Sequence, residues 1–229
     1  LASDGRKLLT LRATYPAHAT SLTGTWEIAM SDTDVTPYAL GLSLPRFTAN
    51  GAGKFETDVN FQTVAASGKL DASAEKLANV RADLATLGAL RLTADFDLVR
   101  EGGAAVRVNR LTAAVSGAQP VLHVQALQPF AFNPQTSELK IADPAKELLE
   151  LTLDGVPLAW AEPFLPGFSI SGSDARGQFF LTPRNGGLSL RPRSAVTVTG
   201  LSVARGGVAL VSALDVSVAP SFDYTAQGW

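Results

Sequence analysis

The sequence predicts an all-β protein, built as a long antiparallel meander of short strands with one or two short helices. The first observation is a period-two alternation of apolar and polar residues, clearest in LRLTADFDLV at 90–99. Such alternation indicates strands with one apolar and one wet face, which is typical of antiparallel sheets. The second observation is a set of glycine-rich turn signals, of which EGG and NGG lie between alternating runs and are interpreted as hairpin loops. The signals are NGAG at 50–53, EGG at 101–103, NGG at 185–187 and RGG at 205–207.

The alternating runs assign large apolar side chains to one shared face of the sheet. The run from 55 to 63 is interpreted as a single strand, and the chain after 175 continues as strand, turn and strand, with LSLRPR and SAVTVTGLSVA as separate strands. The residues predicted on the apolar face are Trp26, Ile28, Met30, Phe55, Val59, Phe61, Leu92, Phe96, Leu98, Phe179 and Leu181.

Two segments have helical features. Helix-like spacing of apolar residues occurs in AEKLANVRADLATL, but the preceding GKLDASA alternates like a strand, so the sequence leaves 74–87 open between helix and strand. The second candidate follows Asp154, which can cap a helix, and has Pro157 in its first turn. Val156, Trp160 and Phe164 are four residues apart and would share one face of it.

Proline limits the length of this second helix. Pro163 disfavours helical backbone at Glu162, and Pro166-Gly167 is expected to end the helix. A short turn of helix is also expected in DPAKELLE at 143–150. The prediction for the whole chain is one repetitive β domain over 1–229, with a sub-boundary near 143–167. Since the sequence starts at Leu1, we expect a piece of a longer chain.

The composition argues against several functional classes. Charged residues are 17% and apolar residues 46%, against about 25% charged residues in an average domain, so the chain has much apolar surface to bury. The net charge of −2 provides no basic surplus for binding phosphates, which argues against a nucleic-acid partner. The chain has no cysteine, so thiolate metal sites and disulfides are excluded. It also has no apolar run of about 20 residues, so no transmembrane segment is expected.

The sequence contains no recognisable catalytic motif. His18 and His123 are far apart and have no partner at metal-ligand spacing, and GFSISG at 167–172 is better interpreted as the entry to a strand than as a nucleophile elbow. Acidic pairs such as Asp95/Asp97 on a wet face and the basic RPR at 191–193 are interpreted as solvated surface. We therefore expect no enzymatic activity, no catalytic residue, no metal and no cofactor.

The stretch PLAWAEPFLPGFSISGSDARGQFFL, an apolar helix followed by a glycine-opened strand, resembles a pattern of the AsmA/TamB-like proteins of the Gram-negative envelope. VAASGKLDASAEKLANVRADL and LRLTADFDLV are similar to the strand repeats of that family. The resemblance covers about half of the chain. It implies a long open β groove (a β-taco) with a hydrophobic interior, a location in the periplasm as part of a membrane-associated parent protein, and phospholipid transport toward the outer membrane.

A sheet with one apolar face must cover that face, as a closed sandwich, as a barrel, or by curling into a groove that holds lipid. About fourteen strands would form a trough roughly 65 Å long. In the groove hypothesis, the apolar-face residues named above contact acyl chains, and the helix with Val156, Trp160 and Phe164 covers the groove. The alternative is a structural or adhesive β-sandwich that binds a protein partner. An enzyme on a β scaffold is the least favoured hypothesis.

Overall fold

The computed structural model describes residues 2–3, 6–16, 19–39, 43–136, 138–184 and 187–224. Within them, fifteen strands belong to one antiparallel sheet, and a separate pair is formed by β1 (Ala2–Ser3) and β2 (Arg6–Lys7). The strands of the large sheet are β3 (Leu9–Thr14), β4 (Ser21–Ser31), β5 (Arg46–Asp58), β6 (Thr63–Glu75), β7 (Leu90–Glu101), β8 (Val106–Ser116), β9 (Pro120–Ala126), β10 (Phe130–Asn133), β11 (Glu138–Ile141), β12 (Leu149–Val156), β13 (Phe168–Ser171), β14 (Ala175–Arg184), β15 (Gly187–Arg205), β16 (Val208–Val218) and β17 (Phe222–Tyr224).

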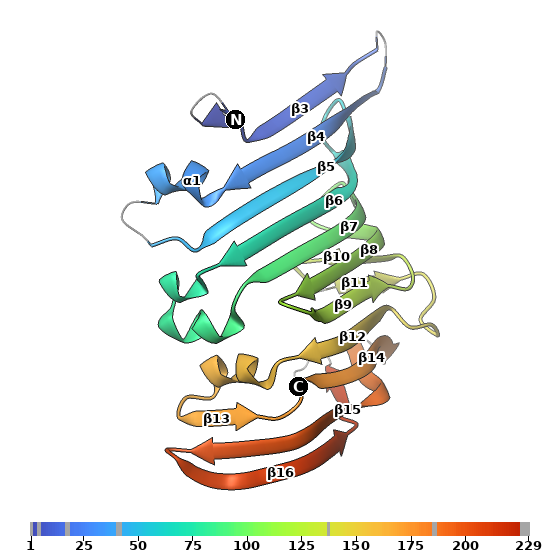
Figure 1. The fold of residues 1–229 in the computed structure, drawn as a ribbon. Coiled ribbons are helices and arrows are strands. Elements are labelled where there is room, and N and C mark those ends of the chain that lie inside the picture. The colour runs from blue at the N-terminus through green and yellow to red at the C-terminus, as the bar shows by residue number, and fades with distance from the viewer. Residues whose placement is uncertain are drawn as a thin grey trace.

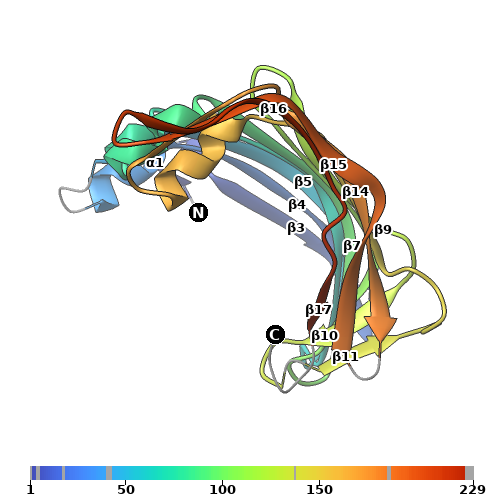
Figure 2. The ribbon, with the colours of Figure 1, turned by 90° about the horizontal axis from the view of Figure 1, so that it is seen from below.

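The strands follow one another across the sheet almost in chain order (Figure 1). The path runs β3-β4-β5-β6-β7-β8-β9-β12-β14-β15, and β16 and β17 pair with β15 at its far side. Seen from below, the sheet curls into an arc that stays open (Figure 2). The prediction of an open, all-β antiparallel groove is therefore confirmed, and the described strands do not form the alternative closed sandwich.

Short helices lie along one long rim of the sheet (Figures 1 and 2). α1 (Asp32–Val35) and the 3₁₀ helix η1 (Thr36–Tyr38) connect β4 to β5. The 3₁₀ helices η2 (Leu77–Asn79) and η3 (Ala82–Leu87) connect β6 to β7, and η4 (Leu158–Phe164) connects β12 to β13. The segment 74–87 is thus divided, because the strand continues to Glu75 and the helical turns follow it.

The predicted strand from 55 to 63 is corrected by the structure. β5 ends at Asp58 and β6 begins at Thr63, so Val59 and Phe61 lie in the hairpin turn between them, with exposed side chains. The Asp58 carboxylate organises this turn, since it accepts hydrogen bonds from the backbone N–H groups of Asn60, Gln62 and Thr63. A carboxylate that accepts hydrogen bonds from three nearby backbone amides favours the turn over a continuous strand.

The turn predicted at NGAG is also wrong, because Asn50–Gly53 lies in the middle of β5. EGG and RGG do end strands β7 and β15 as predicted, and both of their glycine pairs have positive φ. Of the NGG signal, Asn185 and Gly186 lie outside the described residues, while Gly187 pairs with Arg184 across the β14–β15 hairpin.

The proline-bounded helix differs from the prediction in type and limits. Val156 is the last residue of β12 and Asp154 lies within that strand, so neither belongs to the helix. Pro157 has ψ of 129° and forms the N-cap, and the element is a 3₁₀ helix that tolerates Pro163 inside it. The expected helical turn at 143–150 is absent from the described residues, which contain a hydrogen-bonded loop there followed by β12.

β15 is one strand of 19 residues, where two strands were predicted. Its register with β14 and with β16 shifts at several bulges. Residues 187–197 pair with β14, and residues 196–205 pair with β16. The path from β3 to β16 contains eleven strands because β10, β11, β13 and β17 are side branches. At about 4.8 Å per step the groove measures roughly 48 Å along this path, shorter than the predicted trough.

Candidate functional site: an apolar groove

The pairing registers place one continuous apolar row across ten strands of the sheet. Each member of the row is directly opposite the next, so all of them point to the same face. The row is Leu9, Ile28, Gly51, Leu70, Ala94, Ala113, Val124, Leu151, Phe179 and Pro192. We call this the central row; no member of it carries a polar side chain.

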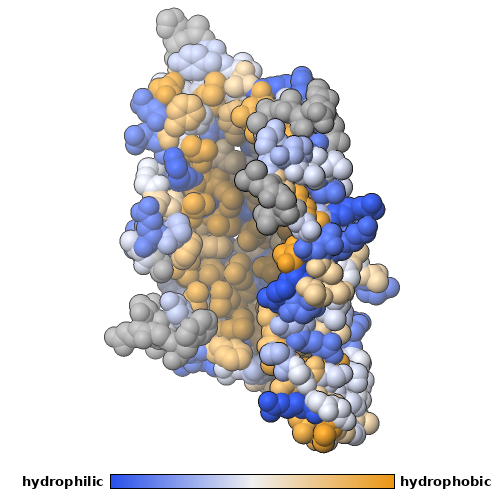
Figure 3. Space-filling view, turned by 90° about the vertical axis from the view of Figure 1, so that its left-hand side faces the viewer, coloured by the Kyte–Doolittle hydropathy of each residue, from blue (hydrophilic) through white to orange (hydrophobic). Residues whose placement is uncertain are grey.

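Neighbouring rows on the same face are equally apolar. On one side lies the row Met30, Ala49, Ala72, Leu92, Val115, Leu122, Leu153 and Gly177. On the other side lies the row Leu11, Trp26, Gly53, Gly68, Phe96 and Leu111. Figure 3 shows this face as a hollow lined by hydrophobic residues. Continuous apolar surfaces of this kind usually mark interaction or ligand-binding sites in monomeric proteins.

The indole ring of Trp26 lies over Gly53 and Gly68 in the N-terminal part of the groove. A β-carbon added to Gly53 or Gly68 would come within 2.6 or 2.5 Å of the Trp26 indole, so only glycine leaves room for the ring. The indole N–H donates to the carbonyl oxygen of Ser67 at 3.2 Å, and the ring stacks on Phe96 with centroids 6.0 Å apart. The two aromatic rings therefore form a low, smooth section of the groove floor.

Most of the predicted apolar-face residues meet on this surface. The three rows and their neighbours contain Trp26, Ile28, Met30, Phe55, Leu92, Phe96, Leu98, Phe179 and Leu181. Val59 and Phe61 are the exceptions, since they lie in the β5–β6 turn. Phe179 is only 5% exposed, so it is packed into the sheet more than it is open to the hollow.

Sequence reasoning missed several floor residues. Leu70, Val124 and Leu151 belong to the central row, although their strands show weaker alternation than β7. The glycines at 51 and 53 were interpreted as a turn. Their spacing of two residues, in phase with Phe55, is the signal that could have placed them on one face of a strand.

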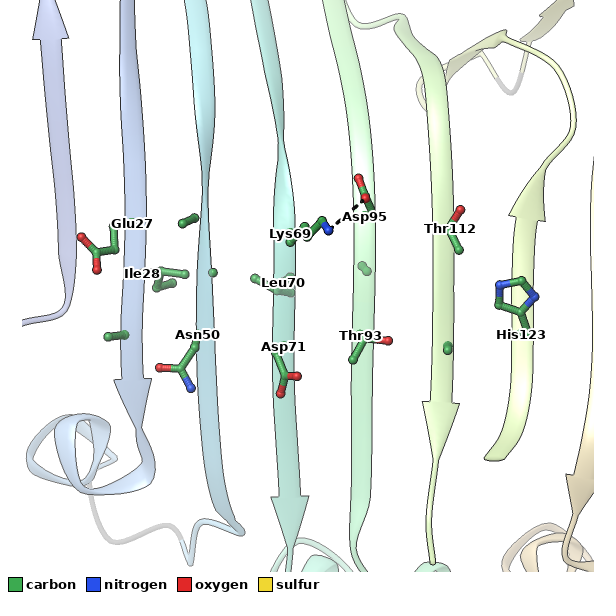
Figure 4. Close-up of a pocket in the computed structure, with 15 residues that line it drawn as sticks. Glu27, Ile28, Asn50, Lys69, Leu70, Asp71, Thr93, Asp95, Thr112 and His123 are labelled. Atoms are coloured by element: carbon green, nitrogen blue, oxygen red, sulfur yellow. Dashed lines mark ion pairs between the residues drawn. The ribbon is translucent and has the colours of Figure 1, made fainter. Parts of the chain in front are cut away.

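The other face of the sheet is polar. One of its rows contains Glu27, Lys69, Asp95 and Thr112, and the next row contains Asn50, Asp71, Thr93 and His123. These eight residues form most of the lining of the shallow depression in Figure 4. These side chains largely neutralise one another, because Asp95 pairs with Lys69 at 3.9 Å and Arg110 at 2.9 Å, and Arg91 pairs with Asp71. The hydrogen bond and charge of Asp71 raise the pKa of the Arg91 guanidinium.

This cross-strand arrangement explains the acidic pairs of the sequence. Asp97 accepts a hydrogen bond from the side-chain amide of Asn109 at 3.1 Å, and Asp95 is held by its two cations. Both carboxylates therefore act within the polar outer face and do not face each other across a cleft. Oppositely charged neighbours across strands stabilise a sheet modestly and keep that face solvated.

The helix η4 borders the groove at its rim. Trp160 lies beside the β8–β9 turn, since a β-carbon on Gly117 would be 3.7 Å from its ring. Glu162 accepts a hydrogen bond from the backbone N–H of Ile170 at 3.1 Å, which ties η4 to β13. Of the three residues proposed for the helix, only Trp160 and Phe164 belong to η4, because Val156 ends β12. Phe164 is exposed, and Trp160 makes the packing contact.

In the described part of the chain, no group of three or more His, Cys, Asp or Glu side chains is arranged to hold a metal ion. Nor does any helix there have the length and hydrophobicity needed to cross a membrane. His123 lies on the polar face and pairs in register with Ala114 and Thr152, while His18 lies outside the described residues. Comparison of the chain with protein families, with curated proteins and with solved structures finds no match.

Proposed function

We propose that the protein is a non-enzymatic lipid-handling segment that holds acyl chains in the apolar groove. The observation that carries this proposal is the central row, which crosses ten strands without a polar side chain. Acyl chains require no hydrogen-bond partner, so a ligand of this kind matches a floor that offers none.

The dimensions of the groove support a lipid ligand. An acyl chain reaches about 15 Å, half the hydrocarbon core of a bilayer, and the groove path measures roughly 48 Å. Several chains could thus lie in file along the floor, and the open side would leave headgroups in water. The aliphatic and aromatic side chains of the floor contact such chains without directional demands, which favours acyl chains as a class over any one lipid.

The setting of this function is also a proposal. The resemblance of PLAWAEPFLPGFSISGSDARGQFFL to AsmA/TamB-like proteins favours a periplasmic location, as part of a membrane-associated parent protein, and a contribution to outer-membrane biogenesis. A curled antiparallel sheet with an apolar hollow is the architecture that this resemblance implies. Envelope proteins are accordingly proposed as further partners.

The test is native mass spectrometry of the purified protein, with lipid extraction from the same sample. We expect co-purified phospholipid in defined stoichiometry. Two adjacent β7 variants separate the faces, because Leu92 lies in a groove row and is 39% exposed, whereas Thr93 lies on the polar face. Leu92→Asp should lose most of the bound lipid, and Thr93→Asp, with the same added charge, should keep it.

The melting temperature of each variant shows whether lost lipid reflects lost folding. The proposal requires that Leu92→Asp lowers lipid occupancy at least several-fold while its melting temperature stays close to that of Thr93→Asp. A wild-type protein that carries no lipid and takes up no added fluorescent phospholipid would refute the proposal. Equal losses in both variants would show that the groove face is not where lipid binds.

A further inference from the structure

The hairpin turn between β5 and β6 carries two bulky hydrophobic side chains into solvent. Phe61 is 62% exposed and Val59 is 49% exposed. Phe61 also has a φ of 54°, a conformation that bulky residues rarely adopt and that glycine or asparagine accepts more readily. The turn therefore keeps a large aromatic side chain where its backbone favours a smaller residue, which indicates a function of that side chain.

The backbone N–H groups of this turn are bonded within the protein. All five from Val59 to Thr63 donate hydrogen bonds of 2.7–3.3 Å, the first to the carbonyl oxygen of Thr20 and the others to the carboxylate or carbonyl oxygens of Asp58. Two carbonyl oxygens of the turn accept bonds from the Arg100 guanidinium at 3.2 Å and the Gly102 N–H at 2.8 Å. Since unpaired backbone groups keep loops out of lipid, these internal bonds make the turn suited to enter it.

The small size of the exposed patch selects the kind of partner. A buried aromatic side chain contributes about 150–250 Å², whereas a standard protein interface covers about 800 Å² of each partner. Two side chains on one turn fall well short of a protein interface. A membrane surface requires neither a large area nor a matching shape, and it buries aromatic and aliphatic side chains at the boundary between headgroups and acyl chains.

The bond from Arg100 also places the turn relative to the groove. Arg100 is in phase with Leu98 on β7, so its side chain starts from the groove face and reaches the carbonyl oxygen of Phe61. The turn therefore lies at a rim of the groove, on the long side opposite the short helices. Glu101 and Arg107 beside it form an ion pair at 2.9 Å, so their charges balance and attraction to lipid comes from the apolar tip.

We propose that the β5–β6 turn inserts Val59 and Phe61 into the headgroup boundary of a phospholipid membrane and holds this rim of the groove against the lipid surface. Membrane docking goes beyond the proposed lipid-handling function and does not depend on a lipid in the groove. Together with that function, it provides a path by which an acyl chain passes from the bilayer to the groove floor without crossing the polar outer face.

The test measures binding of the full chain to phosphatidylcholine vesicles by flotation. Asparagine tolerates positive φ, so Phe61→Asn removes the aromatic ring without adding backbone strain. Phe164→Asn is the matched control, because Phe164 is 71% exposed on the opposite rim. We expect Phe61→Asn to weaken vesicle binding about tenfold, the effect of losing one buried aromatic side chain, with an unchanged or higher melting temperature. Phe164→Asn should bind like the wild type, and high salt should not release either protein.

The depth of the turn can be measured directly. The chain has no cysteine, so a single introduced cysteine carries a polarity-sensitive dye at a known place. The dye on Asn60→Cys should shift its emission to the blue when vesicles are added. The same dye on Val80→Cys should not shift, although Val80 is 60% exposed, because it lies at the C-cap of η2 on the other rim.

Several results would overturn the inference. A wild type that does not float with vesicles excludes docking, and equal losses in Phe61→Asn and Phe164→Asn show that the turn is not the contact. A lower melting temperature in Phe61→Asn shows that the ring packs within the protein. Native mass spectrometry tests the groove separately: a protein that carries no lipid, yet binds vesicles through Phe61, supports docking and refutes the groove function.

Discussion

The N-terminal and C-terminal halves of the groove are built from the same kind of strand but differ in regularity. β4, β5, β6 and β7 pair over their lengths in unbroken register. In the C-terminal half, β12, β14, β15 and β16 are joined through repeated register shifts, and β13 and β17 branch from β15. Regular strands give a broad, gently curved floor, whereas bulges bend the strands and increase their twist.

The side chains of the groove floor largely follow the same division. The C-terminal half contains Leu148, Phe179, Phe180, Val198 and Ser189, all nearly inaccessible, whereas most floor side chains between β4 and β7 are half-buried, with Thr57 buried and Leu92 exposed as exceptions. The comparison teaches that small residues in regular register keep the floor accessible, and that large residues beside bulges pack into a buried anchor. The open half is accordingly the proposed ligand-binding floor, and the irregular half is its structural anchor.

The largest effect is expected at the anchor. Leu148 is 1% exposed, and its backbone bonds to β14 and to the residue after β9: its N–H donates to the carbonyl oxygen of Leu181, and its own carbonyl oxygen accepts from the N–H of Leu127. Leu148→Ala should lower the free energy of unfolding by about 2–5 kcal/mol, because it leaves a cavity. Leu92→Ala on the open floor should cost only about 1 kcal/mol. Urea denaturation of both variants measures the contrast, and equal losses would contradict the division into floor and anchor.

Within the open half, stability should be most sensitive to substitution of the glycines beneath Trp26, Gly53 and Gly68. Gly68→Ala forces a methyl group against the indole and the Ala52 carbonyl, so we expect a loss of about 1–3 kcal/mol and a shift of the tryptophan emission. Gly117→Ala is the control, since its added methyl would have only ordinary contacts at 3.6 and 3.7 Å. A Gly68→Ala protein with unchanged stability and emission would show that the ring can lift without cost.

A smaller effect is expected at the rim of the regular half. Asp34 accepts hydrogen bonds from the backbone N–H and the hydroxyl of Ser31, both at 2.7 Å, and so closes the capping box of α1. Asp34→Ala leaves the Ser31 N–H without this acceptor and should lower the free energy of unfolding by about 1–2 kcal/mol. Asp32→Ala removes a carboxylate from the same turn without the cap and should cost less. Thermal denaturation measures the stability of both variants. A larger loss in Asp32→Ala than in Asp34→Ala would contradict the capping role of Asp34.

The smallest effect concerns pH and the loop before β12. The Ala145 backbone N–H and the Lys146 ammonium, at 3.0 and 3.2 Å, lower the pKa of Asp143. The carboxylate thus stabilises the folded loop above its ordinary pKa of about 3.9, and this contribution disappears as the pH falls through the lower folded pKa. The protection of the Ala145 amide, measured as its exchange rate relative to the intrinsic rate at each pH, should therefore fall below about pH 4 in the wild type and change less in Asp143→Asn. Identical pH profiles would contradict this.

Local pattern was sufficient where one rule acts alone. The alternation of LRLTADFDLV predicted β7 and the faces of Leu92, Phe96 and Leu98, and the EGG and RGG turns were placed correctly. Pattern failed where two rules compete. Glycine is both a turn former and the only residue that fits under a flat indole, so NGAG is a turn by local preference and a strand in the structure.

Contacts between distant segments decided the remaining features. β15 continues through a proline and several bulges because neighbours on both sides satisfy different parts of its length. The sequence by itself determined that the chain forms antiparallel strands with one apolar face, since period-two alternation leaves no other arrangement of these side chains. Only the tertiary structure decided that the apolar face lines an open hollow, because curvature arises from the register between strands and from the bulges in it.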